Sequence, residues 1–216
     1  MEVDARIKAA GAAFASASKK FFTSKQIPLT HKKIAYEGLI LSILLYGSEC
    51  WALSASTRSR LNSFHNRCVR QMCRLTPWHQ WKLRISQHVM EQRLDVKCLD
   101  YYLARRRLAW AGNLARMDFE KRLPRKLLSC WISSKRPHGR PQTGFAQALM
   151  TDIITTGLNA DNWFILAASN EKWDAFIGRD DVHIRSSTAS KSLPQMPVPE
   201  GVRRSSRIAA KLDPQR

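Results

Sequence analysis

Two histidines and two cysteines stand close together in the sequence, and imidazole and thiolate are the usual ligands of structural zinc. They are His65, Cys68, Cys73 and His79. On a continuous helix, Cys73 would lie about 140° around the axis from Cys68, and Cys68 falls on an apolar face. The sequence contains no Cys-x-x-Cys pair. We therefore expect a packed helix here, without a metal ion or another cofactor.

Asp180 and Asp181 form the second candidate, because adjacent carboxylates can hold the Mg²⁺ ions of a polymerase. Such a pair needs apolar strands around it and a third aspartate. Here Gly178-Arg179 precedes the pair and His183 follows it, so a solvated helix end is the better interpretation. The sequence also has no Gly-rich phosphate loop and no set of nucleophile, base and orienting residue. We predict no catalysis and no small-molecule substrate.

A basic Pro/Gly segment is the third candidate. The string Pro137-His138-Gly139-Arg140-Pro141 resembles the core of an AT-hook with His in place of the first Arg, and Lys135 and Arg136 precede it. An extended Arg-Gly-Arg segment can lie in a narrow minor groove. A stiff turn between two helical units is the alternative, and the missing Arg favours it. Lys135, Arg136 and Arg140 remain candidate nucleic-acid contacts.

Positive charge dominates the composition. The 216 residues include 36 Lys and Arg against 17 Asp and Glu, which gives a formal net charge of +19 and a pI near 10.4. Residues 58–140 hold 20 of the basic and 5 of the acidic side chains. A charge this large and this localised favours a polyanionic partner. We expect RNA or DNA, bound with little sequence preference.

The sequence from Arg58 to Leu75 predicts a helix with two different faces. The apolar face holds Leu61, Phe64, Cys68, Met72 and Leu75. The other face holds Arg60, Arg67, Arg70 and Arg74. No acidic residue occurs between positions 58 and 90. A solvated surface would also show this pattern, but arginines without nearby carboxylates favour contact with phosphates, because each contact releases counterions.

A second long helix is predicted from about Lys97 to Met117. Its expected buried residues are Leu99, Tyr102, Leu103, Trp110, Leu114 and Met117. Ala109 and Gly112 leave room for the close approach of another element. The helix also carries three further candidate phosphate contacts, which are Arg105, Arg106 and Arg107.

Helical periodicity also covers the remaining apolar segments, and no alternating strand pattern or hairpin signature occurs. One helix should contain Ile7 to Phe21, and a buried one should follow Pro28, with Thr30 as its cap and Gly47 at its end. Two more are expected at about 145–156 and 161–177. The prediction is an all-α bundle of about five to seven helices. Its expected parts are a thumb-like helical module (1–134), a basic linker (135–142), a helical block (143–178) and a disordered basic tail (179–216).

The amino terminus and the cysteines bear on localisation. Met1-Glu2-Val3-Asp4 does not begin a secretory signal, and the apolar run from Leu39 to Tyr46 is shorter than the roughly 20 residues that a membrane span needs. Five scattered cysteines are typical of a reducing compartment. We expect a nuclear or cytoplasmic protein with no membrane contact.

A family resemblance rests on several blocks in one order. The string Leu44-Leu45-Tyr46-Gly47-Ser48-Glu49-Cys50-Trp51 resembles a signature found downstream of the polymerase palm in reverse transcriptases of non-LTR (LINE-type) retrotransposons. Later blocks of the same family are similar to residues 64–68, 72–74, 106–117, 123–125 and 136–141, and to Gly157-Leu158, Trp163, Ala167 and Trp173. The resemblance covers roughly residues 5 to 178. Asn113, Phe145 and Gln147 depart from the family, where His, Trp and Asp are common.

The resemblance implies the thumb and the region that follows it, whose helices hold a template–primer duplex by its backbone. The palm, with its catalytic aspartates, would lie before Tyr46 and outside this chain. We therefore predict a nucleic-acid-binding fragment of a reverse transcriptase, with the absent palm and fingers as a second partner. The alternatives are a host-retained helical module that binds a protein or chromatin, and a remnant without selected function.

Overall fold

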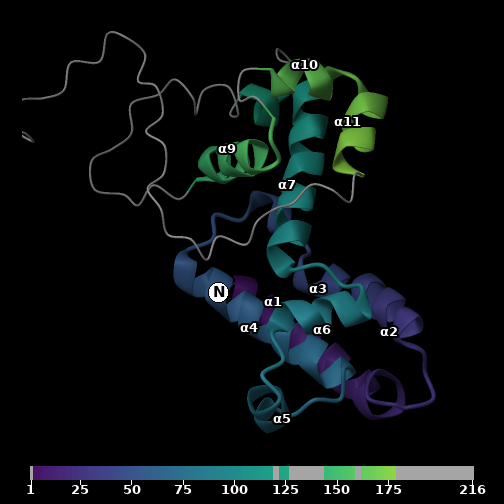
Figure 1. Cartoon of the computed structure of the whole chain (residues 1–216). Helices are drawn as coiled ribbons and strands as arrows, with labels where there is room; N and C mark the ends of the chain where they lie inside the picture. The colour runs from purple at the N-terminus through teal and green to yellow at the C-terminus, as the bar shows by residue number, and fades with distance from the viewer. Residues whose placement is uncertain (1, 119–121, 127–143, 159–161, 179–216) are drawn as a thin grey trace, which may run out of the picture. The chain divides into compact units, whose positions relative to one another are not determined.

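Helices are the regular elements of the computed structural model, which describes residues 2–118, 122–126, 144–158 and 162–178 (Figure 1). All of these residues belong to one unit. No strand occurs among them, which confirms the all-α prediction. The helices are shorter and more numerous than predicted. The predicted linker and tail, and the boundaries drawn around the linker, lie outside the described residues.

The first part of the chain forms two helical stretches with π-helical turns. Its elements are α1 (Glu2–Ala17), η1 (Ser18–Phe22), α2 (Leu29–Ala35), η2 (Tyr36–Leu41), α3 (Ser42–Leu44) and the short 3₁₀ helix η3 (Ser48–Cys50). Gly47 ends the second stretch at φ 71°, as predicted, because glycine adopts left-handed backbone at little cost. The cap prediction was wrong, since Pro28 precedes α2 and Thr30 lies inside it.

Three helices follow, each capped by a hydroxyl side chain. They are α4 (Ala55–Met72), α5 (Pro77–Lys82) and α6 (Gln87–Leu94). Ser54, Thr76 and Ser86 accept hydrogen bonds from backbone N–H groups three residues later, which satisfies donors that a helix start leaves open. The predicted helix at 58–75 therefore begins and ends three residues earlier. The sequence interpretation missed α5 and α6.

The second long helix, α7 (Leu99–Arg116), agrees closely with its prediction. After it come α9 (Phe145–Thr155), α10 (Trp163–Ala168) and α11 (Asn170–Ile177), which Figure 1 shows around the second half of α7. The single helix predicted at 161–177 is interrupted at Ser169, whose backbone is extended (φ −94°, ψ 119°). No helix in the described ranges is both long and apolar enough to cross a bilayer.

Two apolar clusters form the core, and α7 contributes to both. The first half of α7 contributes Leu99 and Leu103 to a cluster that also contains side chains of α1, α4 and α6. The second half packs Leu108, Ala111 and Leu114 against α9, α10 and α11. Tyr102, Trp110 and Met117, which were predicted to be buried, are half-buried.

The prediction of a close approach at Gly112 is confirmed. The indole of Trp173 lies directly over Gly112, and its Nε1 donates to the carbonyl oxygen of Leu108 at 3.0 Å. A side chain at position 112 would occupy the space of that ring. The same prediction for Ala109 was wrong, because Ala109 is exposed.

Candidate nucleic-acid interface

Helix α4 is the element with the clearest division between a core face and a charged face. Its predicted apolar residues Leu61, Phe64, Cys68 and Met72 are all buried. Arg60 and Arg67 are exposed and Arg70 is half-buried. Burial of one face fixes the rotation of the helix about its axis, so these three arginines cannot turn inward.

The arginines predicted along α4 differ in their partners. Arg60 forms an ion pair with Asp4 of α1. Arg67 lies over the ring of Phe64, with its guanidinium carbon 5.4 Å from the ring centroid. Arg70 donates from Nη1 to Oε1 of Gln80 at 3.3 Å, which joins α4 to α5. Arg60 is thus partly neutralised, whereas no carboxylate of the described residues pairs with Arg67 or Arg70.

The fourth arginine of the predicted stripe, Arg74, lies beyond the end of α4. It takes φ 60° in the turn after the helix, and Leu75 N–H bonds to the carbonyl of Arg70. This six-to-one bond is typical of a Schellman motif, in which glycine normally occupies the left-handed position. Arg74 is exposed, and its charge, after the larger effect of burial, lowers the pKa of the Lys32 ammonium.

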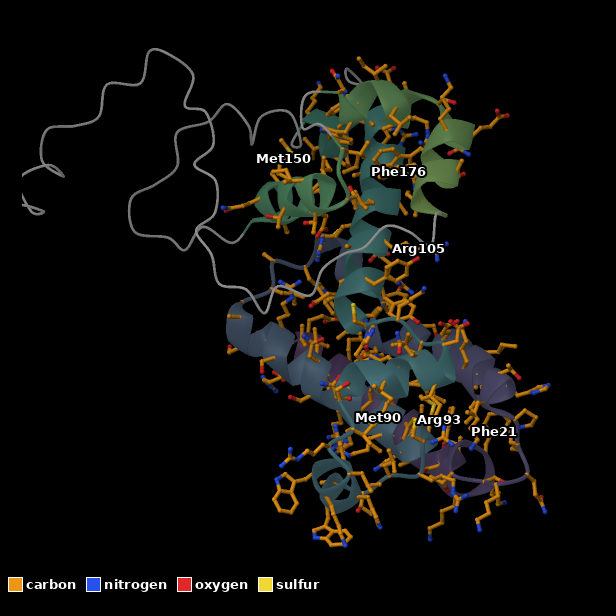
Figure 2. All side chains as sticks on the ribbon, viewed as in Figure 1. Phe21, Met90, Arg93, Arg105, Met150 and Phe176 are labelled. Atoms are coloured by element: carbon orange, nitrogen blue, oxygen red, sulfur yellow. The ribbon has the colours of Figure 1, made fainter. Side chains whose placement is uncertain are left out.

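Only part of the predicted Arg105–Arg107 cluster faces solvent. Arg105, labelled on α7 in Figure 2, is exposed. Arg106 is half-exposed, donates to the carbonyl of Leu45 at 3.1 Å and lies 3.8 Å from a carboxylate oxygen of Glu49. Both can still approach a phosphate.

Arg107 corrects the prediction, because it is a core residue. Its exposed fraction is 5%, and it donates from Nε and Nη2 to the two carboxylate oxygens of Asp152 at 2.6 and 3.0 Å. This bidentate pair joins α7 to α9. A guanidinium that is buried and held by a carboxylate inside the protein is not accessible to a phosphate, so Arg107 does not belong to the candidate interface.

The remaining candidates lie outside the described residues. These are Lys135, Arg136 and Arg140 of the basic linker, together with the rest of the AT-hook-like segment. Asp180 and Asp181 also lie there. Their roles stay predictions from the sequence.

The histidines and cysteines first considered for zinc have other surroundings. Nδ1 of His65 lies 2.9 Å from the hydroxyl of Tyr36, and burial lowers the pKa of His65 to about 4. Burial raises the pKa of the Cys68 thiol to about 12. Nδ1 of His79 lies 2.6 Å from Oγ1 of Thr76, at the start of α5. Where side chains are described, no three potential metal ligands come together.

A basic aromatic surface on α5 was not predicted as a site. Trp78 and Trp81 are 55% and 78% exposed, and Lys82 and Arg84 are exposed beside them. A hollow at this place is lined by Pro77, Gln80, Trp81, Lys82, Arg84 and Ile85. The signal was present in the sequence: Thr76 followed by Pro77 is a common helix start, and two tryptophans with lysine and arginine follow it.

Comparison with known proteins finds a sequence similarity to a transposon-derived protein. The chain is 26% identical over 187 residues to an uncharacterized transposon-derived protein of Caenorhabditis elegans. The match covers 83% of this chain and 64% of that protein, so the chain spans less than two thirds of the relative. No family model and no solved structure matches. The similarity supports a transposon origin for the chain.

Proposed function

With a transposon origin as the premise, we propose that the chain is a nucleic-acid-binding C-terminal region of a non-LTR retrotransposon reverse transcriptase. It holds RNA or DNA by the phosphate backbone and catalyses nothing alone. The palm and fingers of such a polymerase would be its second partner and supply the polymerising carboxylates. Its place of action would be the nucleus or the cytoplasm.

The observation that carries this proposal is the charged face of α4. Its core face is buried, so Arg67 and Arg70 project from a fixed surface, and Arg74 is exposed in the turn after the helix. Among the described residues, no carboxylate pairs with any of the three. Phosphates can therefore replace water around these guanidinium groups without first breaking an ion pair.

The order of the sequence blocks supports the more specific part of the proposal. Thumb helices need a packed body and phosphate contacts that do not depend on sequence. Helices α4 and α7 contribute to the packed body and carry arginines that could make such contacts. The candidate phosphate contacts are Arg67 and Arg70 on α4, Arg74 in the turn after it and Arg105 on α7, while Arg60 and Arg106 are partly engaged by acids.

The test is salt-dependent binding by the whole chain. Fluorescence anisotropy with a labelled RNA–DNA hybrid should show affinity that falls steeply as salt rises from about 50 to 200 mM. The triple variant Arg67→Gln, Arg70→Gln, Arg74→Gly should bind all sequences more weakly. Its plot of log affinity against log salt should lose roughly 3 units of slope, because each phosphate contact contributes about 0.9.

The control removes the same charge from another face. Lys8, Lys19 and Lys25 are exposed on or next to α1 and η1, and their replacement by Gln should change the slope far less. Arg74→Gly also places glycine at a left-handed backbone position, which glycine adopts at little cost. The substitution should therefore not destabilise that turn, and weaker binding by the triple variant would reflect the lost charges. Binding that does not depend on salt would refute the proposal. Absence of binding would favour a module that docks on protein.

A further inference from the structure

Helix α5 has no role in the core. It has no buried residue, and both of its tryptophans face solvent. Indole rings are large apolar groups that proteins usually bury, and exposed ones are enriched where a partner binds. A capped helix that presents two indoles to solvent therefore points to an external ligand.

Cations are interleaved with these indoles. The ammonium of Lys82 lies 4.7 Å from the ring centroid of Trp78. Arg84 lines the same hollow as Trp81 and takes a left-handed backbone (φ 49°) in the turn that ends α5. The bond from Arg70 to Gln80 holds α5 beside the charged face of α4. The aromatic surface is thus continuous with the proposed phosphate-binding surface.

The alternation of ring and cation identifies the ligand class. Unpaired bases offer flat faces to stack on aromatic rings, and the phosphates between them meet lysine and arginine. A duplex keeps its bases stacked on one another, so its bases cannot reach an indole on the protein surface. No acidic residue occurs between positions 58 and 90, so this segment has no carboxylate of its own to neutralise its cations. A protein partner would therefore have to supply a carboxylate opposite each cation.

We propose that α5 is a stacking platform for unpaired nucleotides, in which Trp78 and Trp81 contact bases while Lys82 and Arg84 contact the adjoining phosphates. This inference rests on the proposed function and makes it more specific. In a chain that holds a duplex on α4, the platform binds a single strand that leaves the duplex. The bases are recognised by their faces, so sequence preference is weak.

The experiment compares the binding of two polymers by the wild type and by variants of α5. Binding of the full chain to a labelled oligothymidylate and to a labelled hybrid duplex is measured for the wild type and for the double variant Trp78→Leu, Trp81→Leu. The single-strand affinity should fall at least 10-fold in the variant, because stacking contributes strongly for each base. The duplex affinity should stay within about twofold. Trp78→Phe, Trp81→Phe should keep most of the single-strand affinity.

The controls separate base stacking from non-specific apolar binding and from unfolding of the protein. Ile165→Ala removes another highly exposed apolar side chain, on α10, and should leave both affinities unchanged. The leucine variant should melt as the wild type does, because α5 buries nothing. Equal single-strand binding by variant and wild type, or an equal loss on both polymers, would overturn the platform. Failure of the wild type to bind the duplex would instead refute the proposed function.

Discussion

Replacing Gly112 by alanine sets two known effects against each other. In the interior of a helix, glycine to alanine normally stabilises a protein by about 1 kcal/mol, because glycine loses more conformational freedom on folding. At position 112, however, the new Cβ would overlap Nε1 and Cδ1 of Trp173. Trp173 is fully buried, so the ring has no free space into which to move.

The clash should outweigh the gain in helix propensity. Forcing a methyl group into a packed core costs about 1 to 3 kcal/mol. Displacing the Trp173 ring also breaks its 3.0 Å hydrogen bond to Leu108 and leaves the buried indole N–H unpaired, which costs about another 1 to 3 kcal/mol. After subtracting about 1 kcal/mol for propensity, we expect Gly112→Ala to lower the free energy of unfolding by about 1 to 5 kcal/mol.

Gly11 of α1 provides the matched control. A Cβ at position 11 would lie 3.6 Å from Cε2 of Phe64, which is ordinary van der Waals contact, so Gly11→Ala should stabilise the chain by about 0.5 to 1 kcal/mol. Urea unfolding followed by circular dichroism measures both variants. The packing argument at Gly112 is wrong if the two substitutions shift stability in the same direction.

Three other outcomes are expected. Asp152→Ala should destabilise the chain by about 3 to 5 kcal/mol in urea unfolding, because it leaves the buried Arg107 charge unpaired. The double variant Arg107→Met, Asp152→Leu removes both charges and should be nearly neutral. Equal losses of stability in the two variants would contradict this reasoning. The pKa of His65 is about 4 in the folded chain, against 6.5 for the free side chain, so the unfolded state binds more protons between these values. The free energy of unfolding should therefore fall by roughly 3 kcal/mol from pH 6.5 to 4, and His65→Phe should flatten that slope. Cys50 is exposed and Cys68 is buried with a raised pKa, so iodoacetamide mapping by mass spectrometry should label Cys50 in the native chain and Cys68 only after unfolding.

The long helices were predictable because many residues repeat the same signal. Over α4 and α7 the apolar spacing marks both the helix and its buried face, and Leu61, Phe64, Leu103 and Leu114 are buried as predicted. The glycine at 112 was also predictable as a point of close approach, although the ring that fills it comes from 61 residues later in the chain.

The short helices were missed because their ends do not use glycine. Arg74, Arg84 and Asp95 take positive φ in the turns after α4, α5 and α6, where a glycine would have marked the stop. A helix of one or two turns also has too few residues to show a period. The hydroxyl caps at Thr76 and Ser86 were the readable signal.

The error at Arg107 has a different cause. Arg105, Arg106 and Arg107 are identical in type and adjacent, and helical rotation by about 100° per residue sends them in different directions. Which one is buried depends on Asp152 of α9, a carboxylate 45 positions away. A tertiary partner of this kind leaves no trace in the local sequence around an arginine.

The continuity of α7 through both apolar clusters has a consequence for shortened copies of this chain. A product that stops before α9 would keep α7 as a folded helix, because Leu99 and Leu103 still pack in the first cluster. The second half of that helix would then present Leu108, Ala111 and Leu114 as a bare apolar ridge. Such a product would self-associate through this surface instead of unfolding. The length of the chain therefore decides whether the protein stays monomeric or aggregates.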